Sequence, residues 1–235
     1  IYIQLLYHFY PVIEVVHFTA KYWIYIFIAG VSQILATVLM VQLFKQKNYA
    51  IGVGLAKSEA ILAAIIGVAF LSNHLSFLAW IGVLIGGYAV FLLSKGNQLS
   101  GLSAKTLMIG VGSGLCFAIT SLLVREASLE LTNLPVLHRA SWVLISVIGF
   151  QCISMLIYLS LFSRKTLVAM RERMGLTMKV GFCSFTASLG WFTAMSMMSV
   201  PVVKTLGQIE ILFSMLISAY FFKDKLAKAE HWGLV

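Results

Sequence analysis

The amino-acid sequence predicts an all-α integral membrane protein. Hydrophobic residues make up 60% of the 235-residue chain, and only 11% of the residues are charged. Mean hydropathy is +0.96, well above what a water-soluble domain of this length shows. The apolar segments run for about 20 residues each, which is the length of helix that crosses a hydrocarbon core, whereas a membrane β-barrel would alternate in segments of about 10 residues.

Seven helix-length apolar spans lie between the polar segments of the chain. In chain order they are 21–44, 50–71, 76–95, 105–125, 136–162, 176–198 and 201–222. Pro135 and Pro201 each stand at the start of a span, where a missing backbone N–H costs little. Residues 1–12 are predicted to end one more helix and residues 231–235 to begin another. We therefore expect a truncated bundle with about seven full helices and two stubs.

An internal repeat relates the two halves of the chain at a spacing of 151 residues (59 to 210) and places Glu59 on Glu210. The other matched pairs are Gly30 with Gly181, Leu55 with Leu206, Ile66 with Ile217, Phe70 with Phe221, Leu75 with Leu226 and Gly82 with Gly233. The repeat unit holds five helices, so its two copies must face opposite ways in the membrane, as in many secondary transporters. We predict an N-terminally truncated first repeat over 1–96, a linker over 97–104 and a C-terminally truncated second repeat over 105–235.

Three segments of the chain carry a resemblance to a known family. KTLGQIEILFSMLISAYFFKDKLAKAEHWGLV at 204–235 is similar to the fourth helix, charged turn and fifth-helix start of EamA-type permeases in the drug/metabolite transporter superfamily, and residues 49–94 are similar to the same region of the first repeat. HRASW at 138–142 resembles the arginine-bearing opening of a helix in the second repeat. The family's usual glycine–glutamate turn is replaced by Ser-Asn-His at 72–74 and Lys-Asp-Lys at 223–225. The resemblance implies a ten-helix, five-plus-five inverted-repeat transporter.

Basic residues are unevenly divided between alternate loops, which explains the net charge of +9 better than nucleic-acid binding does. Three lie on one side: Lys21, Arg125 and Arg139. Twelve lie on the other side: Lys45, Lys47, Lys95, Lys105, Arg164, Lys165, Arg171, Arg173, Lys179, Lys223, Lys225 and Lys228. By the positive-inside rule the richer side is cytoplasmic. We predict a multi-pass protein of the cell membrane, with the bacterial inner membrane favoured.

Glu59 and Glu210 are the main candidates for a functional site, because each interrupts an apolar span. A carboxylate near the bilayer midplane is costly and therefore indicates function. In apolar surroundings a carboxyl can be held protonated, so it can carry a proton or bind a cationic group. The alternative is a hydrogen-bonded carboxyl that only ties helices together. Function is favoured because the two recur at matched positions, and Glu210 is favoured over Glu59 because Gln208 and Ser214 add polar groups near it.

Four other side chains are candidates for substrate binding. Gln208 would donate to a substrate or to a neighbouring helix, and the sequence leaves this open. Arg139 would attract an anionic substrate group, or anchor to lipid headgroups. Tyr25 and Trp191 would line a cavity, although plain packing is favoured for both. Lys204, one turn into its span, is interpreted as snorkelling toward the membrane surface.

No enzyme, cofactor or metal site is predicted. The three cysteines and five histidines show no metal-ligand spacing, and no nucleophile elbow or paired-carboxylate motif is present. GVGSG at 110–114 lacks the preceding strand and further glycines of a nucleotide-binding loop. Gly110 and Gly114 are instead predicted to allow close helix packing.

The favoured function is secondary transport, with export of small metabolites or drugs by alternating access. The alternative is a non-transporting membrane scaffold or an intramembrane enzyme. An enzyme would need a clustered nucleophile or metal set, and a scaffold would not need two matched carboxylates. The expected partners are a small-molecule substrate, the lipid bilayer and a second copy in a homodimer, with no nucleic acid.

Overall fold

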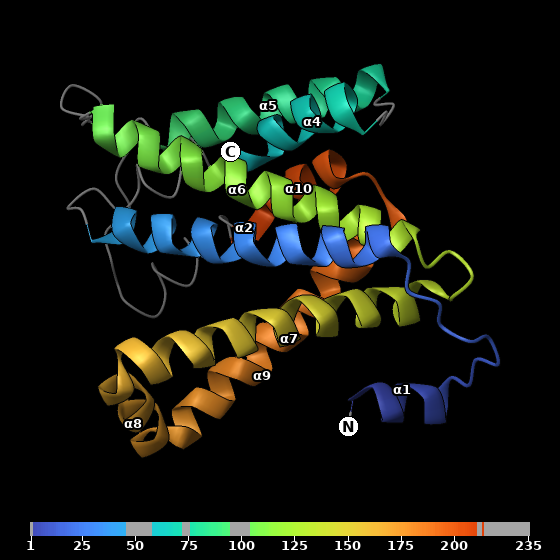
Figure 1. The fold of residues 1–235 in the computed structure, drawn as a ribbon. Helices are drawn as coiled ribbons and strands as arrows, with labels where there is room; N and C mark the ends of the chain where they lie inside the picture. The colour runs from blue at the N-terminus through green and yellow to red at the C-terminus, as the bar shows by residue number, and fades with distance from the viewer. Residues whose placement is uncertain (1, 46–57, 72–75, 95–103, 211–212, 214–235) are drawn as a thin grey trace. The chain divides into compact units, whose positions relative to one another are not determined.

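The structure is a computed structural model that describes residues 2–45, 58–71, 76–94, 104–210 and 213 (Figure 1). In this part of the chain the secondary structure is helical, without strands. The helices are α1 (Tyr2–Phe9), α2 (Ala20–Phe44), α4 (Glu59–Phe70), α5 (Phe77–Ser94), α6 (Ala104–Leu129), α7 (Val136–Phe162), α8 (Arg164–Glu172), α9 (Met174–Met197) and α10 (Val200–Gly207). The predicted all-α class is confirmed.

The predicted spans 21–44, 76–95, 105–125, 136–162 and 176–198 fall largely on α2, α5, α6, α7 and α9. Only parts of the predicted spans 50–71 and 201–222 are described, as α4 and α10, and the predicted helix start at 231–235 lies outside the described residues. Three of the described helices are long and apolar enough to cross a membrane: Ala20–Leu43, Ala104–Leu129 and Val136–Phe162. Glu59–Phe70 is apolar but shorter. These helices indicate an association with the membrane. The number of spans and the ten-helix plan stay predictions.

Local chemistry accounts for where several helices begin. The Thr19 hydroxyl accepts a hydrogen bond from the backbone N–H of Tyr22 (3.1 Å) and caps α2, and Ser76 does the same for Ala79 (3.2 Å) at the start of α5. Pro135 directly precedes α7, as its sequence position predicts. A second proline opens α10 in its first turn.

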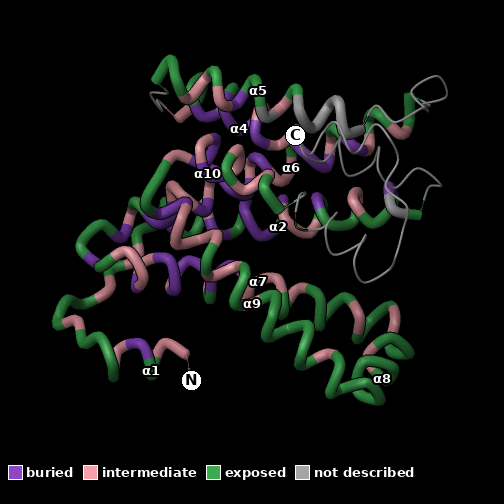
Figure 2. Tube along the Cα trace, turned by 180° about the vertical axis from the view of Figure 1, so that it is seen from behind, coloured by how far each residue is buried: buried purple, intermediate pink, exposed green. Residues whose placement is uncertain are grey.

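The α8 helix is not among the predicted spans. Residues 163–173 read as a polar connection between two spans, whereas the structure forms a nine-residue helix there. The segment is too short and too charged to show the apolar periodicity on which the prediction rested. Figure 2 shows α8 and the adjoining ends of α7 and α9 almost entirely exposed.

The chain divides into two compact units. The first unit comprises residues 1–31 and 123–197, and the second comprises residues 32–122 and 198–235. Each unit takes helices from both predicted repeats, so the division does not follow the predicted repeat boundaries. Apart from Ala104, the predicted linker at 97–104 lies outside the described residues.

The first unit is built around α7, which packs against α9 and α1. Tyr22 is completely buried here, and its hydroxyl lies 2.8 Å from the Ser146 hydroxyl of α7. A phenol that loses water needs such a partner. Gly30 of α2 lies against the Phe150 ring of α7, where an added Cβ atom would overlap the ring. This close approach depends on the missing side chain.

The second unit places α10 against both α4 and α5. The buried residues of α4 are all small: Ala60, Ala63, Ala64 and Gly67. Their spacing puts them on one face of the helix. Small residues let helix backbones approach closely when lipid supplies no hydrophobic force between helices. The same unit holds a hydrogen bond from the buried Ser113 hydroxyl of α6 to the Ala36 carbonyl of α2, at 2.9 Å.

The predicted close packing at Gly110 and Gly114 lies on α6 in this second unit. Both glycines are buried, while Val111 between them is exposed. A Cβ atom added at Gly112, on the same helix, would lie at ordinary contact distance from Leu39. The two predicted glycines therefore face the inside of the unit.

Gly30→Ala should lower the thermal stability of the detergent-solubilised protein, because the new Cβ atom forces the Phe150 ring to move. Overpacking of this kind costs about 1–3 kcal/mol. The matched control is Gly149→Ala on α7, where a Cβ atom meets nothing within 4 Å. Unchanged or raised melting temperature for Gly30→Ala would contradict the packing described here.

Candidate functional site

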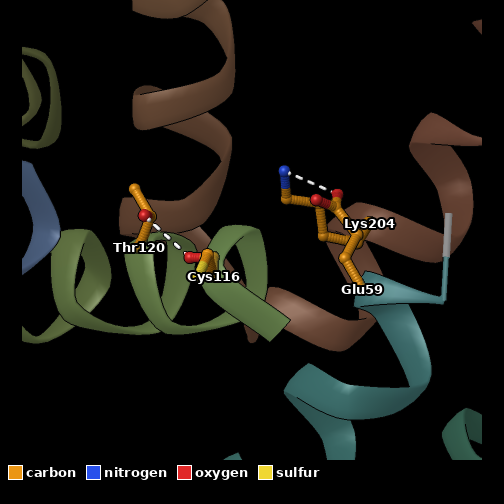
Figure 3. A network of polar contacts seen from close by, with 4 residues as sticks. All are labelled: Glu59, Cys116, Thr120 and Lys204. Carbon is orange, nitrogen blue, oxygen red and sulfur yellow. Dashed lines mark hydrogen bonds and ion pairs between the residues drawn. The ribbon is translucent and has the colours of Figure 1, made fainter. Parts of the chain in front are cut away.

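An ion pair joins α4 to α10 in the second unit. The Lys204 Nζ atom lies 2.8 Å from Oε1 of Glu59, and the two side chains are 15% and 14% exposed. Figure 3 shows the Lys204 side chain of α10 extending to Glu59, the first residue of α4; Cys116 and Thr120 of α6 are drawn in the same view. Two opposite charges on apolar helices lower the cost of holding either one there.

The predicted snorkelling of Lys204 toward the surface is therefore wrong. Its stem and ammonium group are largely covered, and the ammonium group meets a carboxylate instead of water or headgroups. Glu59 and Lys204 stand far apart in the sequence, in segments assigned to different repeats. Sequence spacing gives no signal for such a pair, because only the packing of α10 on α4 brings it together.

Hydrogen-bonding groups without partners lie beside this pair in the chain. Ser58 Oγ, Thr205 Oγ1 and Gln208 Nε2 are buried, and none has a hydrogen-bond partner among the described residues. Ser58 precedes Glu59, while Thr205 and Gln208 follow Lys204 within about one helical turn. Buried polar atoms without partners are uncommon in proteins and call for a water, an ion or a ligand. Among the described residues of the second unit, we take this set of polar groups as a candidate binding site.

The helix of Lys204 is interrupted before Glu210. The backbone N–H of Gln208 donates to Thr205 O (3.2 Å), a tighter turn than the α-helix makes, and helical structure resumes at 209–210. Gln208 is partly covered, whereas Glu210 and its neighbour Ile209 are exposed. The two predicted carboxylates are thus in different surroundings: Glu59 is covered and ion-paired with lysine, and Glu210 is exposed.

Arg139 lies in the first unit, at the carboxyl end of α9. Its Nη2 group donates to Ser196 O (2.9 Å), and Arg125 Nη1 donates to Met195 O (2.8 Å). The Ser128 hydroxyl donates to the Ser196 hydroxyl (2.7 Å) nearby, and this donates in turn within α9. The last carbonyls of a helix lack intrahelical partners and carry its partial negative charge, so arginines stabilise them well. Arg139 therefore has a structural contact that neither of its two sequence interpretations included.

Tyr25 and Trp191 also lie in the first unit, and both are partly exposed. The completely buried tyrosine of α2 is Tyr22, three residues earlier, which is not among the predicted site residues. The sequence places Tyr22 one turn after Thr19. This position does not reveal its burial, because a helix in which nearly every face is apolar does not show which face is covered. Tyr25, Trp191 and Arg139 belong to one unit, and Glu59, Gln208 and Glu210 to the other.

No group of three or more histidine, cysteine, aspartate or glutamate side chains that could hold a metal ion occurs among the described residues. No protein-family model and no curated protein matches the chain. The resemblance to EamA-type permeases is therefore an interpretation of the motifs alone.

The ion pair predicts strong coupling in a double-mutant cycle. Glu59→Gln and Lys204→Gln should each lower the melting temperature, because each leaves one covered charge without its partner. The double variant should recover part of the loss, with a coupling energy of about 0.5–3 kcal/mol. Additive losses, measured by thermal unfolding in detergent, would show that the pair contributes nothing.

Arg139→Gln should destabilise the protein by about 1–3 kcal/mol, because the carbonyl of Ser196 loses a charged donor. The exposed Lys21 on the same predicted side of the membrane provides the control, and Lys21→Gln should leave the unfolding temperature unchanged. Equal stability of both variants would remove the assigned helix-capping role.

Proposed function

We propose that this chain is part of a secondary transporter that moves small molecules across a membrane by alternating access. Two inverted five-helix repeats would rock around a central site, as the resemblance to EamA-type permeases implies. Export of metabolites or drugs from the cytoplasm and a place in the bacterial inner membrane follow from the same resemblance.

The Glu59–Lys204 ion pair is the observation that carries this proposal. It joins α4, assigned to the first repeat, to α10, assigned to the second. A purely structural contact between two apolar helices needs no charge, and small residues already provide close packing along α4. A pair of opposite charges can also be opened by a proton or a charged ligand, which apolar packing cannot.

The chemistry of the pair suggests how transport would be coupled. A proton or a cationic group that binds the Glu59 carboxylate takes the place of the Lys204 ammonium group. Lys204 then loses its contact with the Glu59 carboxylate, and the ionic link between these side chains of α10 and α4 is broken. Loss of this link would favour one arrangement of the repeats over the other, because a ligand shifts a conformational equilibrium by its difference in affinity for the two states. Gln208, Thr205 and Ser58 would supply hydrogen bonds to the bound molecule.

Transport can be tested with the protein in proteoliposomes under an imposed proton gradient, with the fluorescent cation ethidium as the probe. Flux is measured per folded protein for the wild type, Glu59→Gln, Glu210→Gln and Glu59→Gln/Lys204→Gln. We expect at least a roughly tenfold loss for Glu59→Gln and for the double variant, since proton transfer by a positioned group contributes about that much or more. Glu59 should matter more than Glu210, the reverse of the sequence-based expectation, because its carboxylate is covered and paired with a lysine.

Glu14→Gln is the matched control, because Glu14 is exposed and lies outside the helices. It should transport at the wild-type rate. The double variant removes both charges together, so a folded double variant without transport separates function from stability. Normal flux in both Glu59→Gln and the double variant would contradict the proposal. A wild-type protein that neither moves ethidium nor dissipates the proton gradient would also contradict it.

A further inference from the structure

The α8 helix directly follows the end of α7, a helix that is long and apolar enough to cross a membrane, and connects it to α9. At nine residues it spans about 14 Å and is too short to cross a hydrocarbon core. It also packs against both neighbouring helices, so it stays beside their ends.

The segment around α8, residues 164–179, is strongly basic. Glu172 is its only acidic residue, and its basic residues are Arg164, Lys165, Arg171, Arg173 and Lys179. All five basic side chains are exposed. Arg164 donates to Ser160 O (2.9 Å), which holds it against the end of α7. The side chains of Lys165, Arg171 and Arg173 make neither ion pairs nor hydrogen bonds with any described residue.

Exposed apolar side chains lie on both sides of this basic segment. Leu161 and Phe162 end α7 with 70% and 74% of their surface exposed, and Met174 and Leu176 begin α9 at 50% and 59%. In a membrane-embedded chain, exposed apolar side chains of this kind would contact lipid tails. The arrangement of basic helix and flanking apolar groups is that of a helix at the boundary between headgroups and acyl chains.

We propose that α8 and Arg173 form a binding surface for the headgroups of anionic phospholipids in one leaflet of the bilayer. Lys165, Arg171 and Arg173 would bind the phosphates, and the apolar side chains at the ends of α7 and α9 would contact the acyl chains. Charge complementarity selects this partner, because the segment carries five basic residues and one acidic residue. This inference stands on the first unit alone and does not depend on transport.

The test uses delipidated full chain in an uncharged detergent, titrated with phosphatidylglycerol or phosphatidylcholine. Bound lipids are counted by native mass spectrometry, and stabilisation is followed by melting temperature. The test variant is Lys165→Gln/Arg171→Gln/Arg173→Gln. The control variant is Lys21→Gln/Lys45→Gln/Lys105→Gln, which removes the same net charge at three other exposed positions.

We expect the wild type and the control variant to prefer phosphatidylglycerol, and the test variant to lose at least about tenfold in affinity for it. Near an anionic surface each basic residue contributes roughly a fivefold change. An equal loss in both variants, or none in either, would overturn the proposal. So would equal stabilisation by inorganic phosphate, which would point to a site for free anions.

If the test variant does not fold, the wild type decides the question. At an ionic strength of about 1 M, where the Debye length is about 3 Å, its preference for phosphatidylglycerol should disappear. A preference for phosphatidylglycerol that persists at high salt would show that the basic residues are not its cause.

Discussion

Burying a polar group without a hydrogen-bond partner costs free energy, and the contacts between the described helices reflect this cost. Hydrophobic residues make up 60% of the chain, so its few charged and hydroxyl groups stand mostly among apolar residues in the sequence. A polar group that lies on an apolar helix is costly to leave without a donor or an acceptor inside the protein. Polar pairs, as well as small side chains, therefore occur where helices meet. Examples are the hydrogen bond between the Tyr22 and Ser146 hydroxyls and the one from the Ser113 hydroxyl to the Ala36 carbonyl.

Two different solutions to this cost are visible in the two units. In the first unit, arginines of α6 and α7 donate to the last carbonyls of α9, where the helix has acceptors but no donors of its own. In the second unit, a carboxylate of α4 meets an ammonium group of α10. The arginine contacts use backbone acceptors that no proton can neutralise near neutral pH. The carboxylate can be neutralised, so only the second arrangement can respond to protons or to charged ligands.

This difference bears on the alternatives for function. A scaffold is best served by contacts that do not change, such as the arginines on α9 and the small-residue face of α4. The ion pair, with unsatisfied hydroxyl and amide groups near it in the chain, is poorly suited to permanent packing and well suited to exchange partners. In the proposed lipid contact, the exposed basic groups of α8 would be satisfied by phosphates of the bilayer.

The sequence alone determined the all-α class, three of the predicted spans as helices of membrane length (α2, α6 and α7) and the start of α7 and α10 at prolines, because composition and chain-local chemistry carry these signals. It also selected Glu59 as a costly carboxylate. Only the tertiary structure decided that Lys204 pairs with Glu59, that Arg139 caps α9 and that Tyr22 is the buried tyrosine of α2. These facts depend on which helix faces meet. When nearly every face of a helix is apolar, hydrophobic periodicity does not distinguish the face that meets another helix from the face that meets lipid.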